Sequence, residues 1–301
     1  MDDVIRPRTV AALRERIAQR LTGHVDDPQE EARELLAGLH DAPKSWSTLH
    51  ATDELIDLLI DAADDATARR VAGAPLQYAI GRAAFRHLFL HVDERVLIPR
   101  PETEELVTLV LGHIAPQCTV VDVGTGSGAI ALALAQESPA ARVIGTDASP
   151  GAIAVAELNA RAVLRRDSAR TEFLLGNLLE PVGEEHIDIV VSNPPYIALS
   201  ERSAMPTSVL GWEPELALFA GADGMVVIRE LVAQAEQRLT AGGMLLMEID
   251  ARRGAASRAC VPEPQWRDVA VLPDAFGRDR FLVARRTAAT AQHRCLCEGG
   301  A

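Results

Sequence analysis

The chain has 301 residues, of which 48% are hydrophobic, and a formal net charge of −13 at pH 7. This length suits two domains with large cores. The acidic balance, with Lys44 as the only lysine, argues against extended nucleic acid as a partner, because proteins that hold DNA phosphates normally present a basic surface. No apolar run approaches the roughly 20 residues of a membrane span, and the first residues lack a secretory signal pattern. We therefore expect a cytoplasmic protein with no membrane partner.

Apolar residues from Thr9 to Gly73 recur at helical spacing. A first helix is indicated by Val10, Leu13, Ile17 and Leu21. Asp27 before Pro28 is a start signal for a second helix. A third is expected to begin near Thr52, with a buried stripe formed by Leu55, Leu58, Leu59 and Ile60. We predict a small helical domain over residues 1–73, of a type too generic to indicate a function by itself.

The spacing of apolar residues changes after residue 73. Between residues 74 and 100 a β-hairpin hinge is indicated by Phe85, Leu88, Leu90, Val92 and the run from Val96 to Ile98. Strands are then expected at 119–123, 142–145, 171–175, 187–192, 243–249, 266–271 and 280–284, and helices at 129–136, 151–161 and 225–239. This alternation predicts an α/β domain over residues 101–286 with a doubly wound, mainly parallel sheet.

The cysteines are few and scattered. Cys118, Cys260, Cys295 and Cys297 do not form a disulfide framework, and the pair Cys295 and Cys297 has neither the spacing nor the second pair of a zinc site. We expect free thiols, no bound metal and a disordered tail over residues 287–301.

A glycine loop follows the first expected strand of the α/β domain. Val120 to Val123 is apolar except for Asp122, and Gly124, Gly126 and Gly128 follow at alternate positions. Such a loop lets a cofactor approach the backbone closely, and an acid after the next strand, Asp147, suits the hydroxyls of a ribose. A dinucleotide and a methyl-donor cofactor both fit this loop, which by itself does not separate them.

A second motif favours methyl transfer. Asn193, Pro194, Pro195 and Tyr196 directly follow the apolar strand expected at 187–192, at the sheet edge where ligands bind. The Asn193 side-chain carbonyl and the Pro194 backbone carbonyl can accept both N–H groups of a planar amide or exocyclic amine. They would orient its nitrogen and disperse the positive charge that grows there. Tyr196 offers a flat surface for the planar group. Hydride transfer has no use for this arrangement.

With these motifs the chain resembles the HemK/PrmC family, the peptide chain release factor N5-glutamine methyltransferases. The resemblance spans residues 70–285 and includes Pro75 to Tyr78 with Gly81, Val96 to Glu104, both site motifs, Glu213-Pro214, Asp223-Gly224 and Gly277 to Arg280. It implies a Rossmann-like class I methyltransferase domain, preceded by a helical domain that takes part in substrate recognition and by a hairpin hinge. The segment from Asp250 to Pro264 departs from the family pattern, and its structure is left open, a short last helix being one alternative.

The resemblance implies the cofactor S-adenosylmethionine, with S-adenosylhomocysteine as product. The expected cofactor contacts are Asp122, Gly124, Thr125, Gly126, Gly128, Asp147, Ala148, Asn177, Leu178 and Asn193. Asn177 stands where many methyltransferases carry an acid that binds the adenine amino group. Asn193, Pro194 and Tyr196 are expected to be catalytic, and Pro195 joins them in binding substrate. A lid or hinge role is considered for Arg100, Glu102, Thr103 and Glu104, for which a cluster of salt bridges is the simpler interpretation.

The implied substrate is the glutamine of the Gly-Gly-Gln motif in bacterial class 1 release factors, namely release factors 1 and 2, methylated by a monomeric enzyme. Three alternatives remain at this point. An adenine-N6-type nucleic-acid methyltransferase shares the Asn193–Tyr196 motif, but the acidic charge and the lack of room for a target-reading domain argue against it. A ribosomal-protein glutamine methyltransferase departs from the family pattern around Pro99 to Glu104. A non-catalytic binding protein would have little reason to keep both site motifs.

Overall fold

The computed structural model describes residues 7–138, 142–164, 170–184 and 186–287. The predicted tail beyond Thr287, with Cys295 and Cys297, lies outside them. The chain divides into two compact units: Met1–Pro99 with Glu201–Leu218, and Arg100–Ser200 with Phe219–Ala301. In the part of the chain that the structure describes, no helix is both long enough and apolar enough to cross a bilayer.

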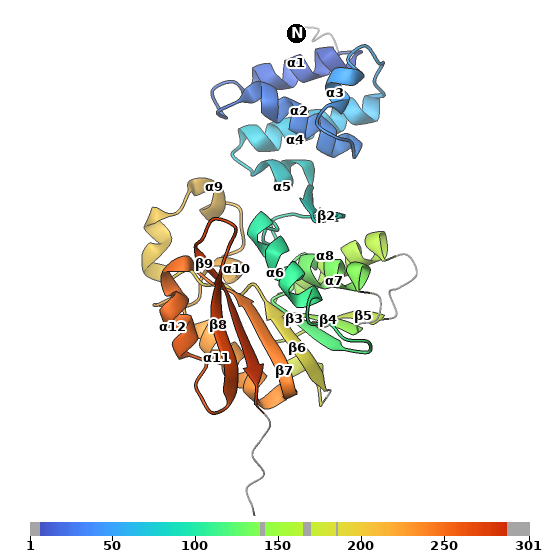
Figure 1. The fold of residues 1–301 in the computed structure, drawn as a ribbon. Helices are drawn as coiled ribbons and strands as arrows, with labels where there is room; N and C mark the ends of the chain where they lie inside the picture. The colour runs from blue at the N-terminus through green and yellow to red at the C-terminus, as the bar shows by residue number, and fades with distance from the viewer. Residues whose placement is uncertain (1–6, 139–141, 165–169, 185, 288–301) are drawn as a thin grey trace, which may run out of the picture. The chain divides into compact units, whose positions relative to one another are not determined.

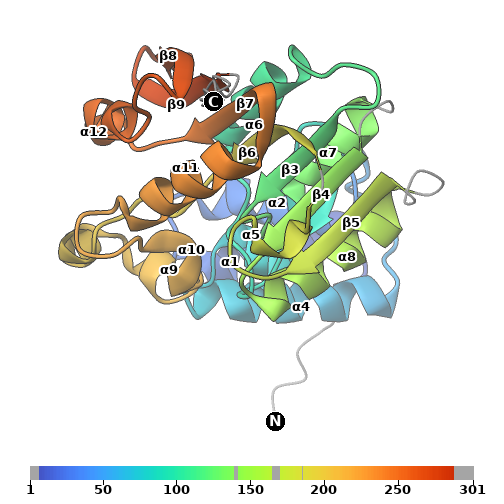
Figure 2. The same ribbon diagram turned by 90° about the horizontal axis from the view of Figure 1, so that it is seen from below.

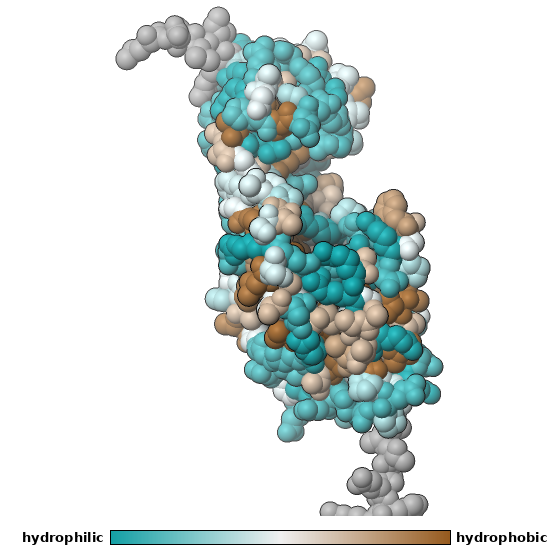
Figure 3. Space-filling model, turned by 90° about the vertical axis from the view of Figure 1, so that its left-hand side faces the viewer, coloured by the Kyte–Doolittle hydropathy of each residue, from teal (hydrophilic) through white to brown (hydrophobic). Residues whose placement is uncertain are grey.

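The first unit is built on three helices, α1 (Val10–Leu21), α2 (Pro28–His40) and α4 (Asp57–Val71), coloured blue to cyan in Figure 1. The side chains of Thr9 and Asp27 cap the first two helices by accepting hydrogen bonds from backbone N–H groups of the first turn. Their shared core contains Leu13, Ile17, Leu21, Leu35, Leu36, Ile60, Ala63 and Ala66. On the face shown in Figure 3, hydrophilic residues predominate over this bundle.

The prediction for the third helix was wrong in its start and in its buried face. The helix begins at Asp57, not near Thr52, and a short helix that was not predicted, α3 (Trp46–Leu49), precedes it. Leu58 is 77% exposed, and of the predicted stripe only Ile60 is buried. Small residues, Ala63 and Ala66, continue the buried face after Ile60, and their weak hydrophobic signal explains the error.

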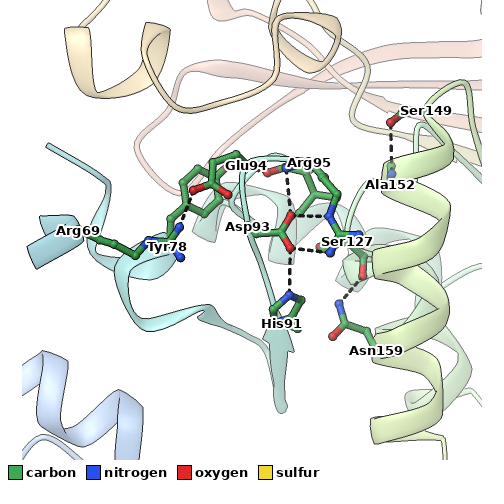
Figure 4. Close-up of polar contacts among 11 residues, drawn as sticks. Arg69, Tyr78, His91, Asp93, Glu94, Arg95, Ser127, Ser149, Ala152 and Asn159 are labelled. Atoms are coloured by element: carbon green, nitrogen blue, oxygen red, sulfur yellow. Dashed lines mark hydrogen bonds and ion pairs between the residues drawn. The ribbon is translucent and has the colours of Figure 1, made fainter. Parts of the chain in front are cut away.

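The hinge hairpin is shorter than predicted. Its strands are β1 (Arg82–Phe85) and β2 (Leu88–His91), and a short helix, α5 (Leu76–Ile80), precedes them. The run from Val96 to Ile98 is not a strand. Its Val96 carbonyl instead accepts a hydrogen bond from the buried Tyr78 hydroxyl at 2.5 Å. After β2, the turn is closed by the Asp93 carboxylate, which accepts hydrogen bonds from Arg95 and contacts the His91 ring (Figure 4).

Three short helices follow the strand that ends at Ser192: η3 (Leu199–Ala204), α9 (Thr207–Leu210) and α10 (Glu215–Leu218). The segment Glu201–Leu218 groups with the first unit, although it falls within the stretch 101–286 that the sequence predicts as one domain. Its Trp212 ring reaches Gly73, where a Cβ atom would lie 3.7 Å from the indole nitrogen.

The second unit contains a seven-stranded sheet in the order β5-β4-β3-β6-β7-β9-β8. The strands are β3 (Thr119–Val123), β4 (Arg142–Asp147), β5 (Thr171–Leu175), β6 (Ile187–Ser192), β7 (Leu239–Glu248), β8 (Trp266–Pro273) and β9 (Asp279–Arg286). The first five in this order are parallel, and β9 runs antiparallel to β7 and β8. This sheet confirms the predicted fold class. The order reverses between β3 and β6, which is where ligands bind in sheets of this kind.

Helices cover both faces of this sheet (Figure 1, Figure 2). Helix α11 (Val226–Arg238) packs on the face to which Val121 and Val123 contribute. Asp122, between them, points to the other face, where it meets α7 (Ala129–Glu137). Helices α6 (Pro101–Leu111) and α8 (Pro150–Val163) contact α7 on that side. The segment after β7, whose structure the sequence left open, holds the turn η4 (Ala251–Arg253) and the six-residue α12 (Gly254–Ala259).

Candidate active site

The glycine loop joins β3 to α7 and leaves open space above its backbone. Gly124 and Gly126 have φ values of +72° and +55°, and a Cβ atom on either would meet nothing within 4 Å. The loop is fixed from below, because the Gly124 and Thr125 N–H groups both donate to the Thr146 carbonyl, at 2.8 and 2.9 Å. This is a cradle in which a ligand can lie directly against the backbone.

The lack of a side chain at Gly128 allows the two helices beside the loop to pack closely. Its φ is +81°, and a Cβ atom there would lie 3.3 Å from that of Ala156 on α8. The neighbouring Ser127 carbonyl accepts a hydrogen bond from Asn159 of α8 at 2.8 Å (Figure 4). Gly128 therefore lets α7 and α8 approach closely and hold the loop between them.

Asp122 orders the loop from beneath and is itself fully buried. Its Oδ2 accepts hydrogen bonds from the Thr125 hydroxyl at 2.7 Å and from the Ala131 N–H at 3.1 Å, while Oδ1 has no partner within the described residues. Burial raises the pKa of Asp122 to about 7; the donors Thr125 and Ala131 oppose this rise, and the charge of Asp147 adds to it. The structure thus gives Asp122 and Thr125 a role in shaping the loop and leaves Asp122 with no exposed surface for a ligand.

The pKa of Asp122 leads to a prediction about stability. Because its folded-state pKa lies above the unfolded value, the folded protein holds a proton between about pH 4 and 7 that the unfolded chain releases. The resulting stability is fully present below the unfolded pKa and is lost as the pH rises towards 7. Asp122→Asn does not titrate, so we expect its stability relative to the native protein to rise between pH 5 and 8 by on the order of 3 kcal/mol. Urea unfolding at several pH values measures this, and parallel curves for the two proteins would contradict it.

Asp147 closes the other side of the cradle at the end of β4. Its Oδ2 accepts from the Gly126 N–H and its Oδ1 from the Ser149 N–H, each at 2.9 Å, and burial raises its pKa. A carboxylate has about four acceptor positions, so Asp147 keeps acceptor capacity beyond the backbone N–H groups of Gly126, Ser149 and Ala148. That capacity is compatible with the predicted contact to ribose hydroxyls, which stays a prediction. The exposed Ala148 follows directly.

Replacing Asp147 with alanine is expected to weaken binding of S-adenosylhomocysteine by roughly 1.5–3 kcal/mol, because two hydrogen bonds to a charged acceptor are lost. Isothermal titration gives the dissociation constant. Glu157→Ala on the exposed side of α8 is the matched control, since it removes a carboxylate that has no contact with the loop. Equal affinities for the Asp147 variant and the control would remove Asp147 from the site.

Asn177 and Leu178 follow β5, the strand paired with β4. The exposed Asn177 donates its side-chain N–H to Glu230 of α11 at 2.8 Å, which leaves its carbonyl oxygen as the acceptor that an adenine amino group would need. Leu178 adopts a positive φ of 48° and packs against the core. Contacts of these two residues with a cofactor stay a prediction.

The Asn193–Tyr196 motif begins where β6 ends, next to the glycine loop. Ser192 pairs with Val123 in the sheet, and its hydroxyl donates to the Val123 carbonyl at 2.7 Å, which ties the two strand ends together. Asn193 is half-buried and donates its side-chain N–H to the Thr103 hydroxyl at 3.0 Å. Its carbonyl oxygen is thereby directed away from Thr103. The tertiary structure thus joins the two motifs that are 69 residues apart in the sequence.

Tyr196 packs partly against the core of the second unit. Burial raises the pKa of its phenol to about 12, and Glu248 adds to this rise while Arg280 opposes it. The phenol therefore stays protonated at neutral pH. It can present a surface or donate a hydrogen bond, and it is not a general base.

The residues considered for a lid or hinge start α6. Arg100 occupies the N-cap position, Glu102 and Glu104 lie in the first turn, and Arg278 is 3.9 Å from Glu102. Thr103 is only 4% exposed and donates its hydroxyl to Glu248 at 2.7 Å. Sequence reasoning did not include Glu248, although one acid in the apolar strand expected at 243–249 was a signal for it.

The sheet order, the glycine cradle after β3 and the Asn193–Tyr196 motif after β6 define a class I, Rossmann-like methyltransferase. The same fold is found in the hMettl16 catalytic domain, crystallised in complex with MAT2A 3′UTR hairpin 6. Its TM-score is 0.52 at 15% identity, over 80% of this chain and 86% of that one. At this identity the likeness concerns the fold alone.

Similarity to family models and to curated relatives indicates the family of the chain, beyond its fold. Residues 104–208 match the methyltransferase small domain and residues 12–81 match the PrmC N-terminal domain. A release factor glutamine methyltransferase from Cereibacter sphaeroides is 39% identical over 94% of this chain and 100% of its own length. One from Moorella thermoacetica is 39% identical over 91% of this chain and 97% of its own. The chain belongs to the release factor glutamine methyltransferase family.

Proposed function

We propose that the protein transfers a methyl group from S-adenosylmethionine to the side-chain amide nitrogen of a glutamine in bacterial peptide chain release factors. The observation that carries this proposal is the placement of Asn193 at the end of β6, beside the glycine cradle, with its amide N–H already bonded to Thr103. The Asn193 carbonyl oxygen then remains to accept a hydrogen bond from the substrate. By family resemblance, the glutamine is that of the Gly-Gly-Gln motif in release factors 1 and 2.

Binding of the methyl donor is assigned to the cradle and its surroundings. The open space above Gly124 and Gly126 takes the donor against the backbone, Asp147 accepts from the ribose hydroxyls, and Asn177 accepts from the adenine amino group. When bound, S-adenosylmethionine supplies a methyl group activated by its sulfonium. Asp122 holds the loop in shape from below.

The chemistry at the substrate nitrogen follows from the acceptors on the Asn193–Tyr196 motif. An amide nitrogen is a weak nucleophile, because its lone pair is delocalised into the carbonyl. The Asn193 side-chain carbonyl and the Pro194 backbone carbonyl can accept its two N–H bonds. They orient the nitrogen and stabilise the positive charge that develops on it. No strong base is needed, since a methylated, protonated amide is very acidic. This agrees with the neutral phenol of Tyr196.

The decisive experiment uses the full-length chain, S-adenosylmethionine and an unmethylated release factor. Mass spectrometry of the tryptic peptide that contains Gly-Gly-Gln is expected to show one added methyl group, located on the glutamine. Parallel reactions with radiolabelled donor and RNA, DNA or ribosomal proteins test the alternative substrates. Labelling of one of these, with no change in the release factor peptide, would contradict the proposal. The net charge of −13 makes nucleic acid the less favourable substrate.

A further inference from the structure

Three side chains from three elements of the second unit form a hydrogen-bonded chain behind the candidate active site. Asn193 follows β6, Thr103 lies in the first turn of α6, and Glu248 ends β7. The Asn193 side-chain nitrogen is 3.0 Å from the Thr103 hydroxyl, which is 2.7 Å from Glu248 Oε2. Thr103 and Glu248 are 4% and 1% exposed. A buried carboxylate is costly, so its retention here requires an explanation.

The donors and acceptors in these two hydrogen bonds follow from the chemistry of the three side chains. The Asn193 amide nitrogen can only donate, so the Thr103 oxygen accepts from it. The single Thr103 proton is then donated to Glu248, which accepts it as a carboxylate. An ionised Glu248 is therefore compatible with only one orientation of the Asn193 amide, the one that directs its carbonyl oxygen away from Thr103.

This orientation matters for the reaction. The substrate amide presents N–H groups, and it needs an acceptor opposite them. If the Asn193 amide were rotated by 180°, its NH2 group would face the substrate NH2 group, and two donors cannot form a hydrogen bond. Without a partner on one side, an asparagine amide has little reason to prefer one orientation over the other.

We propose that Thr103 and Glu248 are positioning residues for methyl transfer, which hold the Asn193 amide with its carbonyl oxygen towards the substrate nitrogen. This inference rests on the proposed function. Neither residue touches the reacting atoms; both act through Asn193.

The protonation state of Glu248 sets the direction of the hydrogen bonds between Asn193, Thr103 and Glu248. Burial raises its pKa to about 7, against the effects of the Thr103 hydroxyl, Arg280 and Arg100, while Glu102 raises it further. Tyr196, the other titratable group beside it, stays neutral. A protonated Glu248 can donate to the Thr103 oxygen, and in that arrangement the Thr103 proton turns towards Asn193 and favours the rotated amide. The rate of methyl transfer is therefore expected to rise with pH through the pKa of Glu248.

Variants of Thr103 and Glu248 separate positioning from a general structural role. Thr103→Val keeps the shape but removes donor and acceptor, whereas Thr103→Ser keeps both. Glu248→Gln can still accept from Thr103 through its amide oxygen but does not titrate. For each full-length protein, the single-turnover rate of methylation of an unmethylated release factor is measured from pH 5.5 to 8.5. The affinity for S-adenosylhomocysteine is measured in parallel.

We expect Thr103→Val to lower the single-turnover rate by about 10- to 100-fold with little change in S-adenosylhomocysteine affinity, because only transition-state interactions are lost. Thr103→Ser should restore the rate to within about 3-fold of the native value. The native rate should fall as the pH drops below 7, by at most about 10-fold per pH unit, as titration of a single carboxylate predicts. Glu248→Gln should keep a lower but measurable rate without this decline.

Several outcomes would overturn the inference. A native-like rate for Thr103→Val is one, and an unchanged acid decline in Glu248→Gln is another, since the titrating group would then be elsewhere, for example Asp122. Loss of cofactor affinity in Thr103→Val that Thr103→Ser does not restore would indicate a structural role only. If the native protein failed to methylate the release factor, the proposed function itself would fall. An active native protein with unaffected variants would remove only the positioning role.

Discussion

Asn193→Ala is expected to lower the single-turnover rate of release factor methylation by about 10²–10³-fold, while the affinity for S-adenosylhomocysteine changes little. The Asn193 carbonyl oxygen meets charge that grows only in the transition state, so its loss should affect the rate and leave ground-state binding largely intact. Single-turnover kinetics and isothermal titration measure the two quantities separately. A near-normal rate in the alanine variant would exclude the proposed hydrogen bond from the substrate amide N–H to the Asn193 carbonyl oxygen.

Asn193→Asp is the sharper comparison, because it keeps an acceptor oxygen and nearly the same size. We expect partial activity, above that of the alanine variant. The aspartate cannot donate to Thr103, so the single Thr103 proton is shared between two carboxylates, those of residue 193 and Glu248. Like charges this close oppose each other's ionisation, so the activity of this variant should depend on pH differently from that of the native protein.

Gly224→Ala is expected to reduce both stability and activity. Gly224 has a φ of +73°, and a Cβ atom there would lie 2.4 Å from the Tyr196 carbonyl oxygen and 2.9 Å from Arg253 Nε. The positive φ costs about 1 kcal/mol and the clash about 1–3 kcal/mol more. The clash is with the backbone of the Asn193–Tyr196 motif, so either this motif or the segment of Gly224 packed against it must move. A displacement of about 1 Å can lower the rate by about 10²-fold.

Gly242→Ala provides the matched control for this variant. Gly242 has a φ of +84° and lies in the same unit near the start of β7, but a Cβ atom there would meet nothing within 4 Å. Gly242→Ala should lose only the stability that the positive φ costs and should keep native methylation kinetics. Thermal unfolding and single-turnover rates are compared for the two variants. Equal rates for both would mean that Gly224 does not hold the Asn193–Tyr196 motif in place.

Three strands of the sheet could be predicted closely from the sequence. The strands expected at 119–123, 171–175 and 187–192 are found with those bounds, because each is a short apolar run enclosed by glycine, proline or polar residues. In a parallel sheet the carboxyl ends of neighbouring strands meet at one edge. The position of each motif after its strand placed both motifs at that edge, and the pairing of β3 with β6 in the structure brings the glycine loop and Asn193 side by side.

The helical unit was predicted less well. Its third helix buries Ala63, Ala66 and Thr67 after Ile60, while Leu58 is exposed. Hydrophobic periodicity gives the wrong face where small residues form the interface and a leucine faces solvent. The grouping of Glu201–Leu218 with the first unit was not predicted either. Nothing local in that segment indicates which distant residues it contacts.

The sequence by itself determined the class of chemistry, because the residue types and their spacing after the strands carry it. Only the tertiary structure decided where these residues lie relative to one another and which of them contact each other. Asp122 is buried beneath the loop, and Glu248, 55 positions after Asn193, reaches it through Thr103 of α6. The physical reason is that local patterns determine secondary structure and its ends. The burial of a charge and the direction of a hydrogen bond depend on side chains that only packing brings together.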